Sequence, residues 1–161
     1  MTDSPTSLTH LATGGVHMVD LATRSDTIRT ALAVGRVLIG EDAYRLVEAG
    51  NIPKGDVLSV AQIAGIMGGN QTSKLLPLCH DVNLKGVDVE LRLTEADFAI
   101  DIQVYAKTVG ATGVEMEALT AVSIAALTVY DMCKSVSKGI LISDIHLVAK
   151  TGGRSGDYRK G

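Results

Sequence analysis

Two side chains around residue 131 have the types and the spacing of an acid–base pair. Asp131 and Lys134 are three residues apart in an apolar, helix-like segment, so both lie on one helix face. Glu117 precedes Asp131 by about four helical turns and would continue the same polar stripe. A carboxylate beside an ammonium group can exchange protons with a substrate. A solvated ion pair worth ~0.3–0.5 kcal/mol has the same spacing, so both interpretations stay open.

A thiol, an imidazole and a carboxylate follow one another at Cys79, His80 and Asp81. Adjacent residues of an extended segment point to opposite faces, so these three do not converge on a zinc ion or on one reacting atom. The other histidines lack the spacing of metal ligands, and we expect no metal site. Two interpretations remain for His80: a pocket side chain that orients a substrate, and an ordinary structural histidine.

Dispersed basic side chains could bind a phosphorylated anion. They are Arg29, Lys54, Lys134, Lys150 and Arg154. Glycines at 152 and 153 would let the backbone approach a phosphate, and an arginine can bind it with two hydrogen bonds. Residues 110–113 could likewise present N–H groups to an anion, or could form a plain turn. The Walker A pattern does not occur in the sequence, and a basic tail can also serve solubility alone.

Hydrophobic periodicity predicts the elements that must position these side chains. Strands are expected at residues 27–39, 86–93, 98–106 and 140–149, and helices at 41–49, from 57 onward and at 114–136. Asp56 is placed to cap the second helix, and residues 68–70 mark a weak or bent point in it. The second and third strands alternate apolar and polar residues and are joined at 94–97, so they form a β-hairpin.

This order of elements predicts an α+β fold, a ferredoxin-like sandwich with helices packed on one face of an antiparallel sheet. Because the other face would stay uncovered, we expect a homo-oligomer. The 161 residues should form a single domain, with residues 1–15 and 151–161 flexible.

Composition excludes several classes of protein. The net charge of −3 and the 3% of aromatic residues argue against a nucleic-acid-binding protein. Two cysteines without a C-x-x-C motif are too few for a disulfide scaffold and fit a reducing compartment. No continuous apolar run reaches about 18 residues, and the start of the chain lacks the apolar region of a secretory signal. We therefore expect a small cytoplasmic globular protein.

Seven short runs together make the chain similar to one known family. They are HMVD at 17–20, PKGD at 53–56, AGI at 64–66, LPLCH at 76–80, TGVEMEAL at 112–119, YDMCK at 130–134 and KTGGRSGD at 150–157. In this order they resemble the cyclic pyranopterin monophosphate synthases of molybdenum cofactor biosynthesis. Each run alone is a weak signal, but all seven in sequence are specific, and the resemblance extends from about residue 8 to 160.

The resemblance implies a lyase reaction. The family converts 3′,8-cyclo-7,8-dihydro-GTP to cyclic pyranopterin monophosphate and releases pyrophosphate. No redox cofactor is implied, and whether Mg²⁺ accompanies the phosphates stays open. The implied assembly is a homohexamer, a trimer of dimers with active sites at the dimer interface, without nucleic acid or membrane as partners.

The resemblance also implies roles for individual residues. Asp131 matches the catalytic aspartate, Lys134 its partner lysine and Lys54 a further candidate proton donor. The implied substrate contacts are Leu78, Cys79, His80, Met116 and Glu117, and the implied phosphate ligands include Arg29, Lys150 and Arg154. Which lysine acts as acid, base or phosphate clamp is left open.

One residue departs from the family pattern: many members have proline after the Cys–His pair, where this chain has Asp81. Asp81 could orient His80, add negative charge near a triphosphate, or be a tolerated loop variation. Two other functions fit the same residues. One is a module that binds a nucleotide or pterin without transforming it, and the other is a structural assembly in which Asp131 and Lys134 form an interface ion pair.

Overall fold

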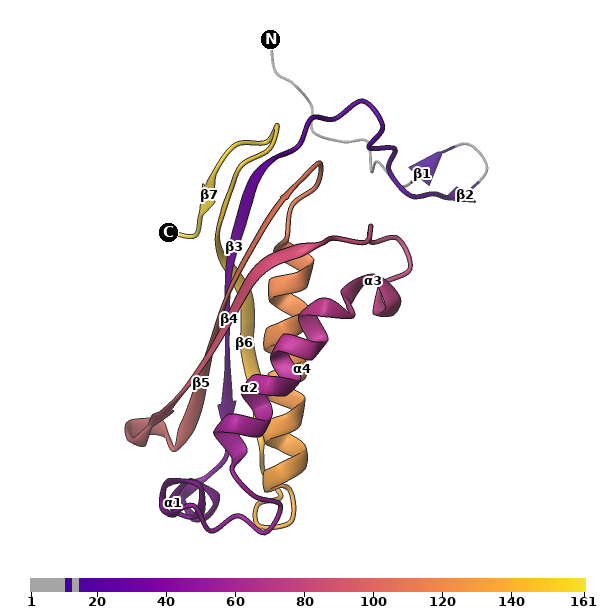
Figure 1. The fold of residues 1–161 in the computed structure, drawn as a ribbon. Helices are drawn as coiled ribbons and strands as arrows, with labels where there is room; N and C mark the ends of the chain where they lie inside the picture. Colours follow the sequence, from indigo (N-terminus) through magenta and orange to yellow (C-terminus); the bar gives the residue numbers. More distant parts are fainter. Residues whose placement is uncertain (1–10, 13–14) are drawn as a thin grey trace.

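An antiparallel sheet of five strands forms the centre of the computed structural model, which describes residues 11–12 and 15–161 (Figure 1). The strand order is β4 (Leu84–Thr94), β5 (Ala99–Gly110), β3 (Thr27–Leu38), β6 (Leu141–Thr151) and β7 (Tyr158–Arg159). A separate pair is formed by β1 (Leu11–Ala12) and β2 (Gly15–Val16). The four long strands are not in chain order, since β3 lies between β5 and β6, as the ferredoxin-like prediction requires.

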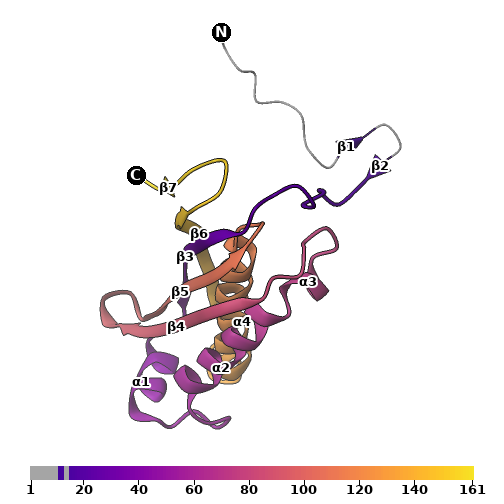
Figure 2. The same ribbon diagram turned by 45° about the horizontal axis from the view of Figure 1, so that its top comes forward.

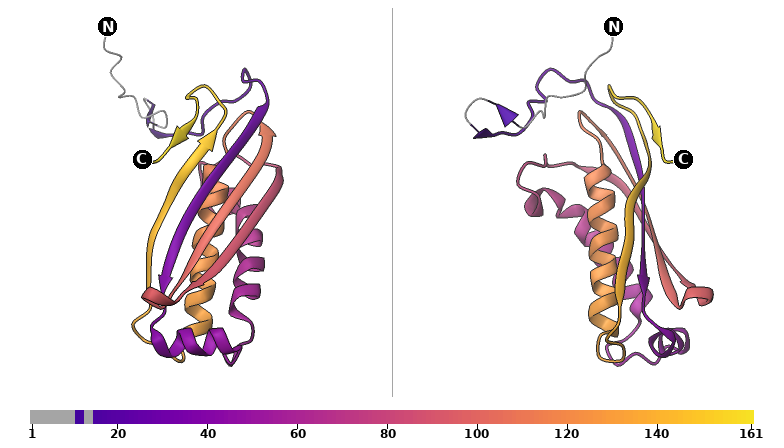
Figure 3. Two further views of the ribbon diagram at one scale, coloured as in Figure 1. Left: turned by 90° about the vertical axis from the view of Figure 1, so that its left-hand side faces the viewer. Right: turned by 180° about the vertical axis from the view of Figure 1, so that it is seen from behind.

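The two long helices cover one face of this sheet, as both views of Figure 3 show. The helices are α1 (Glu41–Ala49), α2 (Val57–Asn70), α3 (Thr72–Leu75) and α4 (Glu115–Cys133), with a short 3-10 turn η1 (Glu95–Asp97). The short helix α1 lies at the lower end of the sheet in Figure 1. The predicted α+β class, antiparallel sheet and one-sided helix layer are confirmed.

The predicted element boundaries hold with small shifts. Asp56 caps α2 as expected, since its carboxylate accepts a hydrogen bond from the Ser59 N–H at 3.2 Å. Phe98, expected in a strand, instead has the left-handed φ of 49° and ends the η1 turn, because its N–H donates to the Glu95 carbonyl. The expectation for residues 1–15 falls almost entirely outside the described part of the chain.

Glycines on α2 let it pack closely against α4. A Cβ on Gly68 would lie 2.7 Å from the Ile124 side chain, and one on Gly65 would lie 3.1 Å from the Ala121 carbonyl. The helix includes Gly68 and Gly69 and ends at Asn70, the stretch where the sequence predicted a weak or bent point. Burial against α4 offsets the low helix propensity of glycine.

Helix α4 is long and apolar enough to cross a membrane by length and composition alone. Here it is the core helix of the fold. Its fully buried residues include Ala118, Val122, Ala125 and Val129, which face the sheet and α2. On the sheet side, Gly35 of β3 gives Val122 its space, since a Cβ on Gly35 would lie 2.6 Å from the valine methyl.

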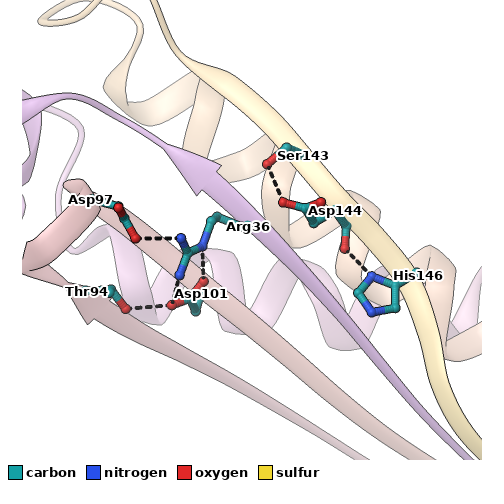
Figure 4. Close-up of polar contacts among 7 residues, drawn as sticks. All are labelled: Arg36, Thr94, Asp97, Asp101, Ser143, Asp144 and His146. Atoms are coloured by element: carbon teal, nitrogen blue, oxygen red, sulfur yellow. Dashed lines mark hydrogen bonds and ion pairs between the residues drawn. The ribbon is translucent and has the colours of Figure 1, made fainter. Parts of the chain in front are cut away.

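The sheet face opposite the helices is polar toward its lower end. There Arg36 on β3 donates to Asp101 on β5 at 2.7 Å and to Asp97 in η1 at 2.7 Å (Figure 4). Thr94 donates to Asp101 at 2.6 Å. Asp144, on the bulged strand β6, has a φ of 57°, and its carbonyl lies 2.6 Å from Nδ1 of His146. The hydrogen bonds from Arg36 to Asp97 and Asp101 fix the β4–β5 hairpin to the central strand β3.

Candidate active site

Lys54, Asp131 and Lys134 meet at the lower end of the molecule. The Asp131 carboxylate accepts hydrogen bonds from Nζ of Lys54 and from Nζ of Lys134, both at 2.8 Å. Lys54 lies in the turn between α1 and α2, where the Gly55 N–H donates to the Ile52 carbonyl. The other two residues lie at the carboxyl end of α4. Packing of α2 on α4 therefore brings together the three residues that the resemblance implied as catalytic.

Charge in this cluster is set by the two lysines. Hydrogen bonds from Lys134 and then Lys54 lower the pKa of Asp131 to about 2, and Asp131 in turn raises the pKa of Lys134. At neutral pH the group is thus a carboxylate held between two ammonium groups. All three side chains are about half exposed, so a ligand can reach them.

A second site is a cavity of about 530 Å³ at the upper end of the molecule, the end turned forward in Figure 2. Three segments form it: the chain before β3, the chain after α3 and the start of α4. Its lining comprises Val19, Leu21, Arg24, Leu76, Pro77, Leu78, Cys79, His80, Val82, Thr112, Gly113, Glu115, Met116 and Glu117. All five residues that the resemblance implied as substrate contacts, from Leu78 to His80 and at 116–117, lie here.

Glu117 is the buried titratable group of this cavity. It is 3% exposed, its Oε1 lies 4.0 Å from Sγ of Cys79, and its Oε2 has no hydrogen-bond partner among the residues that the structure describes. Burial, with smaller contributions from Glu115 and Asp81, raises its pKa to about 7. An acceptor atom left without a partner in a cavity is available to an N–H donor of a ligand.

The surroundings of Cys79 favour the protonated form of its thiol. Burial and then the Glu117 charge raise the pKa of Cys79, so it remains a thiol at neutral pH. Asp81 accepts a hydrogen bond from Ser73 of α3 at 3.1 Å, and within the described residues no hydrogen bond joins its carboxylate to His80. The interpretation that Asp81 orients His80 stays a prediction.

Lys150 reaches the wall of the cavity through Glu115. Its Nζ lies 3.3 Å from the Glu115 carboxylate and donates to Ser155 at 2.7 Å. That carboxylate packs so closely on Gly113 that a Cβ there would clash with it. The Glu115 side chain thus occupies the start of α4, where the sequence left an anion site open.

A smaller cavity of about 250 Å³ adjoins the start of β3. Its lining is Thr23, Arg24, Ser25, Thr27, Arg29, Gly153 and Arg154. Arg29 is 9% exposed and donates to Thr27 at 2.7 Å and to the Ala111 carbonyl at 3.3 Å. Gly153 has a φ of 88°, and a Cβ on it would clash with the Arg29 guanidinium, so glycine is required for this approach.

The C-terminal tail folds back beside this cavity as a short hairpin. Strand β7 pairs with β6, the Gly152 N–H donates to Asp157 at 2.9 Å, and the Lys160 N–H donates to the Val148 carbonyl at 2.8 Å. Residues 152–154 are thereby placed against Arg29. The expected mobility of residues 151–161 stays a prediction.

The residues implied by the resemblance fall into two groups at opposite ends of α4. Glu117 and Asp131 are separated by about 21 Å along the helix axis, at 1.5 Å per residue. Glu117 is buried, so it does not continue a solvated stripe with Asp131, and that interpretation is wrong. The reason is that the loop around Cys79 covers the start of α4, whereas the other end of the helix is open to solvent.

Two site residues were missed in the sequence. Arg24 lines both upper cavities, and Glu115 pairs with Lys150, 35 positions further along the chain. A signal for Arg24 was available, since it lies between the HMVD run and Arg29. No local spacing connects Glu115 with Lys150, because the packing of α4 on β6 alone brings them together.

Comparison with known proteins agrees with this arrangement of residues. The model of the MoaC family matches residues 18–153, which include both groups of site residues except Arg154. The chain belongs to the MoaC family. A relative from Salinibacter ruber, named cyclic pyranopterin monophosphate synthase, is 58% identical over 156 residues, covering 96% of this chain and 92% of its own length. A relative of the same name from Heliobacterium modesticaldum is 55% identical, covering 94% of this chain and 96% of its own length. Another, from Bacillus subtilis, is 48% identical, covering 91% of this chain and 88% of its own length.

Membership of the MoaC family makes this chain an enzyme, in a family that the sequence resemblance connects with molybdenum cofactor biosynthesis. Within residues 11–12 and 15–161, no group of three or more His, Cys, Asp or Glu side chains is arranged to hold a metal ion.

Proposed function

We propose that this MoaC family enzyme is a lyase that converts 3′,8-cyclo-7,8-dihydro-GTP to cyclic pyranopterin monophosphate and releases pyrophosphate. The observation that carries the proposal is the Asp131 carboxylate, held 2.8 Å from two lysine ammonium groups and open to a ligand. A rearrangement with several proton transfers needs an acid and a base in contact, and this cluster supplies both.

The pKa shifts assign roles within the cluster. Asp131 is ionised at neutral pH and can accept a proton. The raised pKa of Lys134 keeps it protonated in the free enzyme, so it serves as proton donor or phosphate clamp rather than as base. Lys54 donates to both the carboxylate and the carbonyl oxygen of Asp131, which ties the turn before α2 to the end of α4.

In this proposal the upper cavities bind the substrate. The purine-derived part would enter the larger cavity, where Glu117 and the backbone around Cys79 can accept its N–H groups. The triphosphate would lie against Arg29, Lys150 and Arg154, which are close to the smaller cavity. No resident cofactor is required by this chemistry. If Mg²⁺ takes part, it would bind to the phosphates of the substrate.

The distance between the two groups calls for a second copy of the chain. One substrate cannot contact both ends of α4 at once, since they are about 21 Å apart along the axis. We propose that the Asp131 cluster of one copy faces the upper cavity of another, within a cytoplasmic homohexamer built as a trimer of dimers. The uncovered sheet face offers surface for such contacts.

A direct assay tests the proposed function. Purified protein is incubated with 3′,8-cyclo-7,8-dihydro-GTP, and pyrophosphate and pterin product are measured. Wild type should form both, whereas Asp131→Ala should lose at least 100-fold in rate, the usual contribution of a positioned acid–base group. The matched control Asp88→Asn changes an exposed aspartate on β4 and should keep wild-type rates.

Two outcomes would contradict the proposal. Near-wild-type turnover by Asp131→Ala would remove this residue from the mechanism. Tight binding of the cyclic nucleotide by wild type without any product would identify a binding module instead of a lyase.

A further inference from the structure

We propose that Asp81 is a positioning residue of the larger upper cavity, whose hydrogen bond to Ser73 holds one wall of that cavity in place. The inference rests on the proposed function, because it concerns the cavity that would bind the substrate. Residues 76–80 and Val82 belong to the lining of this 530 Å³ cavity, whereas Asp81 lies outside that lining. The Asp81 carboxylate instead accepts a hydrogen bond from the Ser73 hydroxyl at 3.1 Å, so it ties the loop to α3.

Helix α3 is a firm anchor for this hydrogen bond. Thr72, beside Ser73, is 1% exposed, and its hydroxyl donates to the Gly69 carbonyl at 2.8 Å. This contact fixes the start of α3 to the end of α2. A Cβ on Gly69 would lie 3.4 Å from the Glu117 carbonyl, so this part of α2 rests directly on the start of α4. The Ser73 hydroxyl therefore has a fixed place relative to Glu117.

Hydrogen bonds hold the loop after α3 on both sides of Asp81. The Cys79 N–H donates to the Leu76 carbonyl at 3.1 Å and closes a turn. At the far end of the loop, the Thr108 hydroxyl of β5 donates to the Asn83 carbonyl at 2.6 Å. Asp81 lies between these contacts, in the stretch that carries two of the cavity residues, and its hydrogen bond to α3 holds that stretch.

This stretch determines what faces Glu117. Sγ of Cys79 lies 4.0 Å from Oε1 of the glutamate, and His80 follows directly in the lining. Burial, followed by the charges of Glu115 and Asp81, raises the pKa of Glu117 to about 7. Asp81 thus has two separable effects on the cavity, one through its hydrogen bond and one through its charge. The positioning effect belongs to the hydrogen bond, which Asp81→Asn would keep, because an amide oxygen also accepts one.

Hydrogen–deuterium exchange tests the contact without turnover. Amide exchange of the peptide that covers residues 76–83 is measured by mass spectrometry in wild type, Ser73→Ala and Asp81→Ala. Loss of the bond should speed exchange in this peptide by about three- to tenfold, the range expected for one hydrogen bond, and leave the rest of the chain unchanged. Asp81→Asn should exchange as wild type does.

Steady-state kinetics with 3′,8-cyclo-7,8-dihydro-GTP give the second measurement. Ser73→Ala and Asp81→Ala should each raise KM by about three- to tenfold, while kcat stays within about twofold, because the Asp131 cluster is untouched. The double variant should raise KM no further than either single variant, since both substitutions remove the same bond. Asp81→Asn should keep a KM close to that of wild type.

Ser143→Ala is the matched control, since it removes another serine-to-aspartate hydrogen bond, the one to Asp144 at 3.2 Å on β6. Ser143 lies outside the cavity lining, so this variant should change neither measurement.

Several outcomes would overturn the inference and leave the proposed function intact. They are wild-type exchange or a wild-type KM in Ser73→Ala, and effects of Ser73→Ala and Asp81→Ala that add in the double variant. An Asp81→Asn variant as impaired as Asp81→Ala would assign the effect to charge and would overturn it as well. Absence of product with wild type would instead overturn the proposed function, while the exchange measurement would still decide the role of Asp81.

Discussion

Two carboxylates on one helix have opposite protonation behaviour because their surroundings differ. Asp131 lies between two ammonium groups at an exposed helix end, which lowers its pKa to about 2. Glu117 is buried without a partner for Oε2, which raises its pKa to about 7. Enzymes assign acid and base roles through such separations. At neutral pH, Asp131 is thus ionised and available as a proton acceptor, whereas Glu117 can exist in either form and can donate or accept a hydrogen bond.

The buried glutamate predicts a specific dependence of stability on pH. Since the pKa of Glu117 rises from 4.5 to about 7 on folding, the folded chain binds more protons than the unfolded chain between these values. The free energy of unfolding of wild type should therefore fall as pH rises through this window, relative to Glu117→Gln. The difference should reach at most about 3 kcal/mol by pH 8. Urea unfolding at pH 4, 6 and 8 measures it.

A variant at an exposed glutamate serves as the control for the comparison of wild type with Glu117→Gln. Glu90→Gln, on the solvent side of β4, should follow wild type at all three pH values. A stability difference between wild type and Glu117→Gln that is the same at pH 4 and pH 8 would contradict the raised pKa.

At the scale of elements, the contact between α2 and α4 positions the charged cluster of Lys54, Asp131 and Lys134. Lys54 precedes α2 and Asp131 ends α4, so the distance between them depends on how closely the two helices pack. Small residues set that distance, with Gly65 and Gly68 against Ala121 and Ile124. The glycines cost helix propensity, but they allow the approach that brings a lysine to within 2.8 Å of the aspartate.

Enlarging one of these glycines should loosen the contact. A Cβ on Gly68 would lie 2.7 Å from Ile124, so Gly68→Ala should lower the free energy of unfolding by about 1–3 kcal/mol. It should also reduce turnover, because Lys54 moves relative to Asp131. Gly86→Ala, on β4 with no atom within 4 Å of the added methyl group, should be neutral or slightly stabilising. Urea unfolding at equal protein concentration compares them, and equal stabilities would refute the close contact.

At the scale of the whole molecule, the fold separates the charged cluster from the upper cavities by the length of α4. The sheet also leaves one face without helices. The proposed assembly would account for both features, since a second copy would cover the sheet and complete the proposed site. Native mass spectrometry should therefore find six times the chain mass of 16.8 kDa.

If each active site is formed by two copies of the chain, two inactive variants should restore activity when they are combined. Asp131→Ala removes the catalytic cluster and His80→Ala alters the cavity, so each alone should be inactive. The two variants are co-expressed with different tags, and the mixed oligomer is purified with both tags. In each mixed dimer, one site then combines an intact Asp131 cluster from one copy with an intact cavity from the other. Activity should then return. A mixed oligomer as inactive as its parents, beside an active mixture of wild type with Asp131→Ala, would place the whole site within one chain.

Much of the fold was predictable from local pattern. Period-two alternation around residues 86–106 determined the β4–β5 hairpin, and the apolar segment after Gly113 determined α4. Asp56 was identified as a helix cap from its type and position, because capping depends only on the next three residues. Asp131 and Lys134 were predictable as a pair for the same reason, since one helical turn joins them.

The remaining features of the site were decided by tertiary structure. Lys54 meets Asp131 across 77 positions of the chain, and Arg24, Arg29 and Arg154 share a cavity because β3 and β6 are neighbours in the sheet. Sequence periodicity reports which face of an element is apolar, but not which distant element packs on it. Burial of Glu117 likewise depends on the loop around Cys79 covering the start of α4. By itself the sequence determined the elements, the helix cap and the family motifs, while long-range packing decided which charges are paired, buried or left open to a ligand.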